Sequence, residues 1–244
     1  MIQDKVLYQT KGLLGYKMEQ SYFTVKTSPE NWQKRNQKNS VVSIEPWQHT
    51  SMTIGKTQVA GRKAWGASNP IWENEVIYYN TEKKSLKSYL NSVVIHHTNN
   101  SYDIRSNEAK HKSQGYAALG YHFFIFGNGR IFEGRPLEVM GSHAGVGKKK
   151  GALADPDWGK IGIVLQGDYH VKDNWFEWAS ETSFPEKQKN ALVELLEGLQ
   201  KKYLVNKVLM HKEIDRGGKG TVCPGDYLYE PIEDIRQKLF KKES

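Results

Sequence analysis

Short apolar runs of strand length alternate with helical patterns along the chain from about residue 59 onward. Residues 92–98 and 161–165 are rich in valine and isoleucine, and residues 208–210 form a shorter apolar run. β-Branched runs of this length are typical of buried strands. Strands that alternate with helices in this order indicate an α/β domain of roughly 180 residues, with a mixed central β-sheet flanked by helices.

Helix signals complete the pattern. Residues 103–114 are polar and compatible with a helix, and residues 183–186 (Ser-Phe-Pro-Glu) have the form of a capping box with proline in the first turn. This box predicts a helix with one apolar face, and Pro231 predicts the start of a last helix. The apolar face comprises Leu192, Leu195, Leu196, Leu199 and Tyr203.

A hairpin is predicted where two apolar runs flank a tight turn. Residues 121–126 and 130–133 are separated by the sequence Gly-Asn-Gly. An Asn-Gly step favours the positive φ angles that a tight turn needs. We therefore expect these two runs to pair as antiparallel strands.

Residues 1–58 differ from the rest of the chain. Their apolar patches, at residues 6–8, 13–14 and 22–23, are short and separated by polar residues, and they contain one histidine, His49. We expect short strands and loops here, with no partner for His49. We assign residues 1–58 to an N-terminal extension and residues 59–244 to the main domain.

Composition and charge narrow the function. The net charge of +8 favours polyanionic partners, but no motif of a nucleic-acid-binding fold is present, so no nucleic-acid partner is expected. No run approaches the ~18 apolar residues of a membrane span, and the N-terminal sequence lacks the apolar core of a secretory signal. The single cysteine, Cys223, excludes an intrachain disulfide and leaves two chemical roles open, metal ligand or nucleophile.

Histidines stand at the ends of two predicted strands. His96 and His97 end the first strand, His211 follows residues 208–210, and Cys223 comes twelve residues later. Successive strand residues face opposite sides, so only one of His96 and His97 can point into a given site. One histidine from each strand plus a thiolate make three protein ligands, and three ligands leave the fourth position of a tetrahedral zinc open, as in catalytic sites.

The chain resembles the zinc-dependent N-acetylmuramoyl-L-alanine amidases of the peptidoglycan recognition protein and phage lysozyme-type family. The resemblance covers about residues 59–240, in family order. It is carried by the blocks RKAWGA, VVIHHT, GYHFFIFGNGRIFEGR, GSHAG, IGIVLQGDY, MHKEID and TVCPGDYLYEPI.

This resemblance implies a role for each matching residue. It makes His96, His211 and Cys223 the ligands of one zinc ion per chain, and Tyr121 and Thr221 catalytic. It places substrate-binding residues along the groove, namely His97, His143 and Arg135, and it gives His111 a supporting or structural role. Residues 148–158 look like a loop insertion beside the groove, and Lys160, Pro136 and Leu137 depart from the family pattern.

The implied activity is hydrolysis of the amide between N-acetylmuramic acid and the L-alanine of the stem peptide by zinc-activated water. Zinc lowers the pKa of bound water to about 7 and polarises the carbonyl. No glutamate is placed as a general base, so Tyr121, a thiolate-bound water or His143 is expected to handle the proton. The expected partner is peptidoglycan, the expected site of action is the cell wall, reached by phage lysis or a secretion system, and the expected state is a monomer. Residues 1–58 are expected to target the enzyme or to dock on the catalytic domain, a delivery machine, an immunity protein or the glycan.

Three other interpretations remain open. Cys223 could be the nucleophile of a cysteine amidase, although such cysteines usually open a helix and Cys223 is followed by Pro-Gly. The chain could be a peptidoglycan-binding module without activity, which would not need all of His96, His211 and Cys223. These residues could also be ordinary core residues. Bound zinc with chelator-sensitive hydrolysis separates the zinc amidase from all three.

Overall fold

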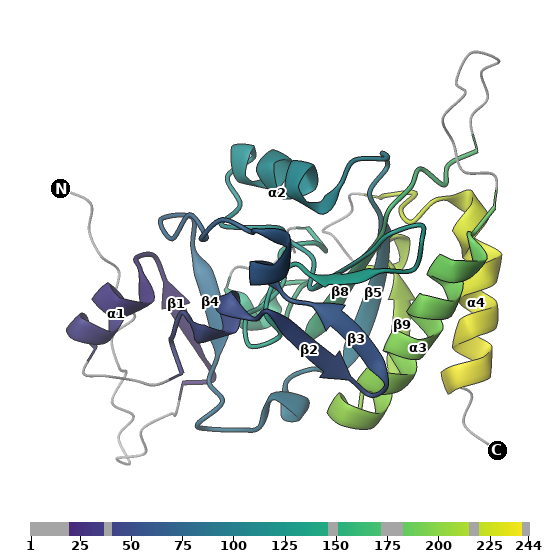
Figure 1. Cartoon of the computed structure of the whole chain (residues 1–244). Helices are drawn as coiled ribbons and strands as arrows, with labels where there is room; N and C mark the ends of the chain where they lie inside the picture. Colours follow the sequence, from purple (N-terminus) through teal and green to yellow (C-terminus); the bar gives the residue numbers. More distant parts are fainter. Residues whose placement is uncertain (1–19, 37–40, 146–150, 172–182, 215–219, 241–244) are drawn as a thin grey trace.

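The computed structural model describes residues 20–36, 41–145, 151–171, 183–214 and 220–240, and its centre is a seven-stranded mixed sheet (Figure 1). The strand order is β2-β3-β7-β6-β8-β5-β9, with parallel pairing of β6, β8, β5 and β9. A separate two-stranded sheet joins β1 to β4. The strands are β1 (Tyr22–Val25), β2 (Ser51–Ile54), β3 (Thr57–Ala60), β4 (Val76–Tyr79), β5 (Ser92–His97), β6 (Phe123–Ile125), β7 (Ile131–Glu133), β8 (Lys160–Leu165) and β9 (Lys207–Met210).

Helices cover both faces of the sheet, as an α/β architecture requires. In Figure 1, α3 and α4 lie next to each other beside β9, whereas α2 lies on the other side of the sheet. The α-helices are α1 (Pro29–Arg35), α2 (Ile104–Ser113), α3 (Glu186–Tyr203) and α4 (Asp226–Phe240). The mixed sheet flanked by helices confirms the predicted fold class.

Side-chain alternation divides the core into two parts. Ile95 and Leu165 belong to the large cluster that α3 and α4 close with leucine and isoleucine side chains. Val164, the register partner of His96, belongs to a smaller cluster that includes Ile104 of α2. His96 therefore lies on the α2 face of the sheet and His97 on the α3 and α4 face, in agreement with the predicted separation.

Two helix starts differ from the sequence prediction. Helix α3 begins at Glu186 with Pro185 as its N-cap and no side-chain cap, so the predicted capping box is not formed. Helix α4 begins at Asp226 rather than at Pro231, because Gly225 adopts a φ of 100° and lets the chain turn into the helix five residues earlier. The predicted hairpin is confirmed by β6 and β7, with Gly129 in the left-handed region.

The described part of the N-terminal extension is built into the main domain. The boundary expected between residues 58 and 59 falls inside β3, which pairs with β2 on one side and with β7 on the other. The indole of Trp47 donates a hydrogen bond to the hydroxyl of Tyr78 at 2.9 Å and packs in a second apolar cluster with β1 and β4. The apolar patches at residues 6–8 and 13–14 lie outside the described residues.

His49 has a partner that the sequence did not indicate. Its Nδ1 lies 2.9 Å from Oε1 of Glu133, a buried carboxylate at the end of β7. This ion pair joins the extension to the central sheet. Among the described residues, no helix combines the length and apolar character needed to cross a bilayer.

Candidate active site

The two predicted strand ends and the following loop bring His96, His211 and Cys223 together. His96 is the fifth residue of β5, and His211 directly follows the adjacent strand β9. Cys223 lies beside them because its carbonyl accepts a hydrogen bond from the backbone N–H of Lys212 at 2.9 Å. One ligand atom from each of the three side chains lies within 4.8 Å of the other two.

The spacing suits a tetrahedral metal ion. Nδ1 of His96 lies 3.8 Å from Sγ of Cys223, and the His96 and His211 rings have centroids 4.4 Å apart. Around a zinc ion with Zn–N near 2.0 Å and Zn–S near 2.3 Å, a nitrogen and a sulfur ligand lie about 3.6 Å apart. Two imidazoles and a thiolate are also ligands that zinc favours, so the residues present fit the metal that the resemblance implies.

The position of His211 is fixed by local contacts. The backbone N–H of Met210 donates to Oε2 of Glu213 at 2.6 Å, which closes the turn that starts with His211. The same carboxylate oxygen pairs with Arg236 of α4 at 2.7 Å. The end of β9 is thereby tied to a long helix.

Tyr121 and Thr221 border the same cluster. The Tyr121 ring lies 5.0 Å from the His96 ring, and burial raises the pKa of its phenol above the usual range, with the Cys223 charge as a smaller cause. The Thr221 hydroxyl accepts a hydrogen bond from the backbone N–H of Cys223 at 3.2 Å. Thr221 therefore helps to shape the turn that carries the thiol.

His97 belongs to a different group. With Asp168 and His170 it forms a second set of ligand-type atoms within 4.8 Å of one another. Its ring contacts that of His170 at 4.4 Å, and its Nδ1 accepts a hydrogen bond from the backbone N–H of Tyr169 at 3.2 Å. Burial lowers the pKa of His97 to about 4, with His170 as a smaller cause.

This arrangement disfavours metal binding by His97. A neutral imidazole has one lone pair and one N–H. Because Nδ1 of His97 accepts the Tyr169 N–H, the ring proton stands on Nε2. A metal ion would have to break this hydrogen bond to obtain a nitrogen lone pair.

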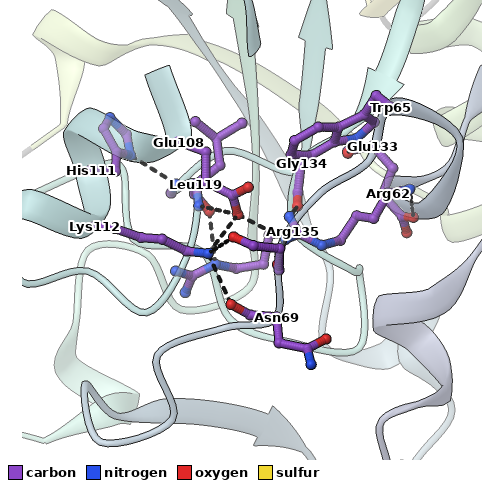
Figure 2. Close-up of polar contacts among 12 residues, drawn as sticks. Arg62, Trp65, Asn69, Glu108, His111, Lys112, Leu119, Glu133, Gly134 and Arg135 are labelled. Carbon is purple, nitrogen blue, oxygen red and sulfur yellow. Dashed lines mark hydrogen bonds and ion pairs between the residues drawn. The ribbon is translucent and has the colours of Figure 1, made fainter. Parts of the chain in front are cut away.

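Two of the predicted groove residues are buried instead. Arg135 is 4% exposed, and its Nε donates to the carbonyl of Leu119 at 3.1 Å (Figure 2). Its Nη1 donates to the carbonyl of Met140 at 2.9 Å. Burial lowers its pKa to about 10. The His143 side chain is fully covered, with Nδ1 3.0 Å from Nε2 of His96. Backbone carbonyls and a neighbouring imidazole contact these polar atoms, and substrate contact by the two residues stays a prediction.

Arg62 anchors the RKAWGA block within the fold. Figure 2 shows its guanidinium between α2 and the loop after β7. It pairs with Glu108 at 2.8 Å, donates to the Gly134 carbonyl and stacks on the rings of Trp47 and Trp65. This block is therefore structural.

His111 supports Tyr121 from α2. Its Nδ1 accepts a hydrogen bond from the backbone N–H of Gly120 at 3.0 Å, and its ring lies 5.3 Å from that of Tyr121. Burial lowers the pKa of His111 to about 4. These contacts agree with the supporting role expected for it.

Asp157 is a residue that the sequence analysis missed. It lies in the segment that we interpreted as a loop insertion, yet it is 3% exposed and its Oδ1 is 3.2 Å from Nε2 of His143. The sequence feature that could have indicated Asp157 is its position three residues before β8, where a loop residue can turn back toward the sheet.

The fold and this cluster define a class: an α/β protein in which two histidines and a cysteine that could hold a metal ion meet near the ends of parallel strands. Residues 86–226 match the model of the N-acetylmuramoyl-L-alanine amidase family. The match includes more than half of the chain, and the chain belongs to that family.

Individual proteins show the same relationship. The chain is 38% identical over 101 residues to peptidoglycan-recognition protein SC2 of Drosophila simulans, covering 37% of this chain and 50% of the relative. It is 31% identical over 104 residues to the endolysin of Klebsiella phage KP32, covering 43% and 60%. It thus spans about half the length of the first relative. Drosophila PGRP-LB shares the fold, with a TM-score of 0.53 and 24% identity over 75% of this chain and 97% of that one.

Proposed function

We propose that the protein is a zinc-dependent N-acetylmuramoyl-L-alanine amidase that cleaves the bond between N-acetylmuramic acid and the L-alanine of the stem peptide in peptidoglycan. The observation that carries this proposal is the convergence of His96, His211 and Cys223, with Tyr121 alongside, in a chain of the amidase family. The site of action is then the cell wall.

The chain's own residues divide the work. Zinc held by His96, His211 and Cys223 supplies Lewis acidity toward water and the scissile carbonyl. Tyr121 donates a hydrogen bond to the oxyanion that forms as the amide is attacked, an interaction typically worth ~10²–10³ in rate. The Thr221 hydroxyl accepts a hydrogen bond from the Cys223 N–H and so holds the turn of Cys223. We assign its hydroxyl hydrogen to a contact with the substrate.

Two alternative functions use the same residues differently. A cysteine amidase would use Sγ of Cys223 as nucleophile and His96, 3.8 Å away, as base. A peptidoglycan-binding protein would use the groove without hydrolysis. The similarity to a peptidoglycan-recognition protein supports this second alternative. The presence of His96, His211 and Cys223 together favours the enzyme.

Mass spectrometry of purified peptidoglycan after incubation with the protein tests the proposal. We expect stem peptides with a free L-alanine amino terminus, no release when a chelator is present, and recovery of release on addition of Zn²⁺. Release that survives complete metal removal would favour the cysteine nucleophile. Binding to peptidoglycan without release in the zinc-loaded protein would favour the recognition module.

We further propose that the extension docks on the catalytic part and contributes no catalytic group. The described residues 20–36 and 41–58 include β1, α1, β2 and Trp47, and the Trp47 cluster contains none of the residues that we assign to catalysis. A chain of residues 41–244 keeps Trp47, β2 and β3, so we expect it to cleave a soluble muramyl peptide at nearly the full-length rate and to lose activity on whole sacculi.

A chain of residues 59–244 is the matched comparison. It lacks β2 and half of β3, and we expect it to lose its cooperative thermal transition. If residues 41–244 fold and hold zinc but fail on the soluble substrate, the extension is part of the active site and this proposal is wrong.

A further inference from the structure

We propose that His143 and Asp157 form a buried chain that positions His96 as a metal ligand, an inference that rests on the proposed zinc site. Nε2 of His96 lies 3.0 Å from Nδ1 of His143. Nε2 of His143 lies 3.2 Å from Oδ1 of Asp157. Neither His143 nor Asp157 belongs to the group of His96, His211 and Cys223, and both act only through His96.

The ring protons can be placed consistently along this chain. Nδ1 of His96 faces the thiol of Cys223, so it is the nitrogen that would hold the metal. Its Nε2 then carries a proton and donates it to Nδ1 of His143. His143 in turn carries its proton on Nε2, which lies 3.2 Å from Oδ1 of Asp157 in an ion-pair contact without hydrogen-bond geometry. This assignment gives the His96–His143 hydrogen bond one donor and one acceptor.

The fold contains a slot shaped for the His143 ring. Gly141 and Gly162 both lie against the Cδ2–Nε2 edge of this ring, and a Cβ atom built at either position would overlap it. Gly162 is in β8, next to β5, so the slot is part of the sheet that carries His96. Both positions lack a side chain where the imidazole packs, which argues against an incidental contact.

Asp157 is itself held in place. Its Oδ1 accepts hydrogen bonds from the backbone N–H groups of His143 and Ala144 at 2.9 and 3.0 Å. Its own N–H donates to Oδ1 of Asp155 at 2.9 Å. The carboxylate therefore fixes the backbone of His143 by hydrogen bonds and lies close to its imidazole. Partners of this kind, which orient a metal-bound histidine and raise its basicity, typically change metal affinity 10–100-fold.

Zinc affinity, measured by competition with a chromophoric chelator, tests this chain directly. In His143→Phe the ring volume is kept and the acceptor for His96 Nε2–H is lost, so we expect zinc to bind 10–100-fold more weakly. His143→Gln, whose amide oxygen can accept that proton, should recover most of the affinity. Asp157→Asn keeps an acceptor for the two backbone N–H groups, removes the charge, and should weaken binding severalfold.

His97→Phe is the matched control, because it replaces the neighbouring buried histidine of β5 on the opposite face. It should leave zinc affinity unchanged. The absorption spectrum of the Co²⁺-substituted protein gives a second measurement, since a reoriented His96 would shift the ligand-field bands of His143→Phe and leave those of His97→Phe unchanged.

The outcomes separate this inference from the proposed function. If the wild-type protein binds no zinc, the proposed function itself fails. If the wild type binds zinc and both His143→Phe and Asp157→Asn bind it equally well with unchanged Co²⁺ spectra, the proposed function stands and the positioning chain is wrong. An equal loss of affinity in His97→Phe would also overturn it, since the effect would then be general to buried histidines near β5.

Discussion

His96 and His97 are consecutive residues of β5, and each lies in a group of three ligand-type side chains. The two residues differ in the hydrogen-bond partner of one ring nitrogen, which determines whether the other nitrogen can bind a metal. On the α2 face, Nε2 of His96 has an imidazole behind it that can accept a proton, which leaves Nδ1 for a metal. On the opposite face, Nδ1 of His97 already accepts the Tyr169 N–H.

This comparison shows that proximity of histidines and carboxylates does not by itself define a metal site. His97, Asp168 and His170 satisfy the same distance criterion as His96, His211 and Cys223. A histidine can bind a metal through one ring nitrogen only if the hydrogen-bond partner of its other ring nitrogen leaves that lone pair available. Such partners therefore affect metal affinity. We therefore expect one zinc per chain, in the His96 group.

The largest effect is expected from removal of the thiolate. Cys223→Ala should reduce bound zinc from near one equivalent to less than about a tenth, and turnover by ~10³-fold or more, because two imidazoles alone hold zinc weakly. Metal analysis and hydrolysis of a muramyl peptide measure both. Zinc retained in full by this variant would remove Cys223 from the ligand set.

Cys223→Asp distinguishes the two roles of the cysteine. A carboxylate can ligate zinc but cannot replace a thiolate nucleophile. Zinc binding and residual hydrolysis in this variant would support the metal role, whereas zinc binding without any hydrolysis would support the nucleophile.

Tyr121→Phe should give the next largest effect. Its ring lies beside His96, and its hydroxyl is the donor that we assign to the oxyanion. We expect kcat to fall ~10²-fold with zinc content and KM nearly unchanged. Steady-state kinetics on zinc-loaded protein would exclude Tyr121 from the reaction if kcat stayed at the wild-type value.

His97→Phe tests the other side of the comparison. The backbone N–H of Tyr169 would lose its acceptor in a buried position, which typically costs about 1–3 kcal/mol of folding free energy. Zinc content should stay at the wild-type level. Chemical denaturation and metal analysis would contradict this interpretation if stability were unchanged while a second equivalent of zinc was lost.

Sequence reasoning predicted that the strand-end histidines and Cys223 meet because strand ends and alternation are local properties, and the family resemblance then selected His96. His96 and His97 could be separated without any coordinates, since the side-chain period of a strand is two residues. The family blocks supplied the remaining assignments, including Tyr121. The central sheet and its flanking helices followed from the same runs of β-branched and leucine-rich sequence.

The supporting contacts could not be predicted because they depend on how loops return to the sheet. Asp157 contacts His143 only after the loop before β8 folds back, and its position shortly before a strand does not by itself predict that contact. The burial of Arg135 depends on carbonyls of Leu119 and Met140. The sequence analysis separated the extension from the domain because its apolar patches look too short for a core. In the structure β2 pairs with β3, and Trp47 packs in an apolar cluster with residues of β4.

The smallest expected effect is that of replacing a third histidine, His49. Unlike His96 and His97, this histidine has a carboxylate as its hydrogen-bond partner. His49 lies against the buried Glu133 carboxylate, and this hydrogen bond raises its pKa above 6.5, assisted by the charges of Glu133 and Glu138 and opposed by burial. A histidine with a raised folded-state pKa stabilises the fold below the unfolded-state pKa, and this contribution disappears as pH rises through the folded-state value. His49 is therefore expected to hold a proton, in contrast to the neutral His97 and to His96, which we propose as a metal ligand.

His49→Gln should consequently lower the melting temperature more at pH 5.5–6 than at pH 9. The His49 side chain is 35% exposed, so solvent screening limits the effect to less than about 1 kcal/mol. Subtracting the melting curves of wild type and variant at each pH removes the titration of the metal ligands, which both proteins share. A difference that is constant with pH would mean that His49 contributes through packing or a neutral hydrogen bond, and one that grows toward pH 9 would reverse the sign of the interaction with Glu133.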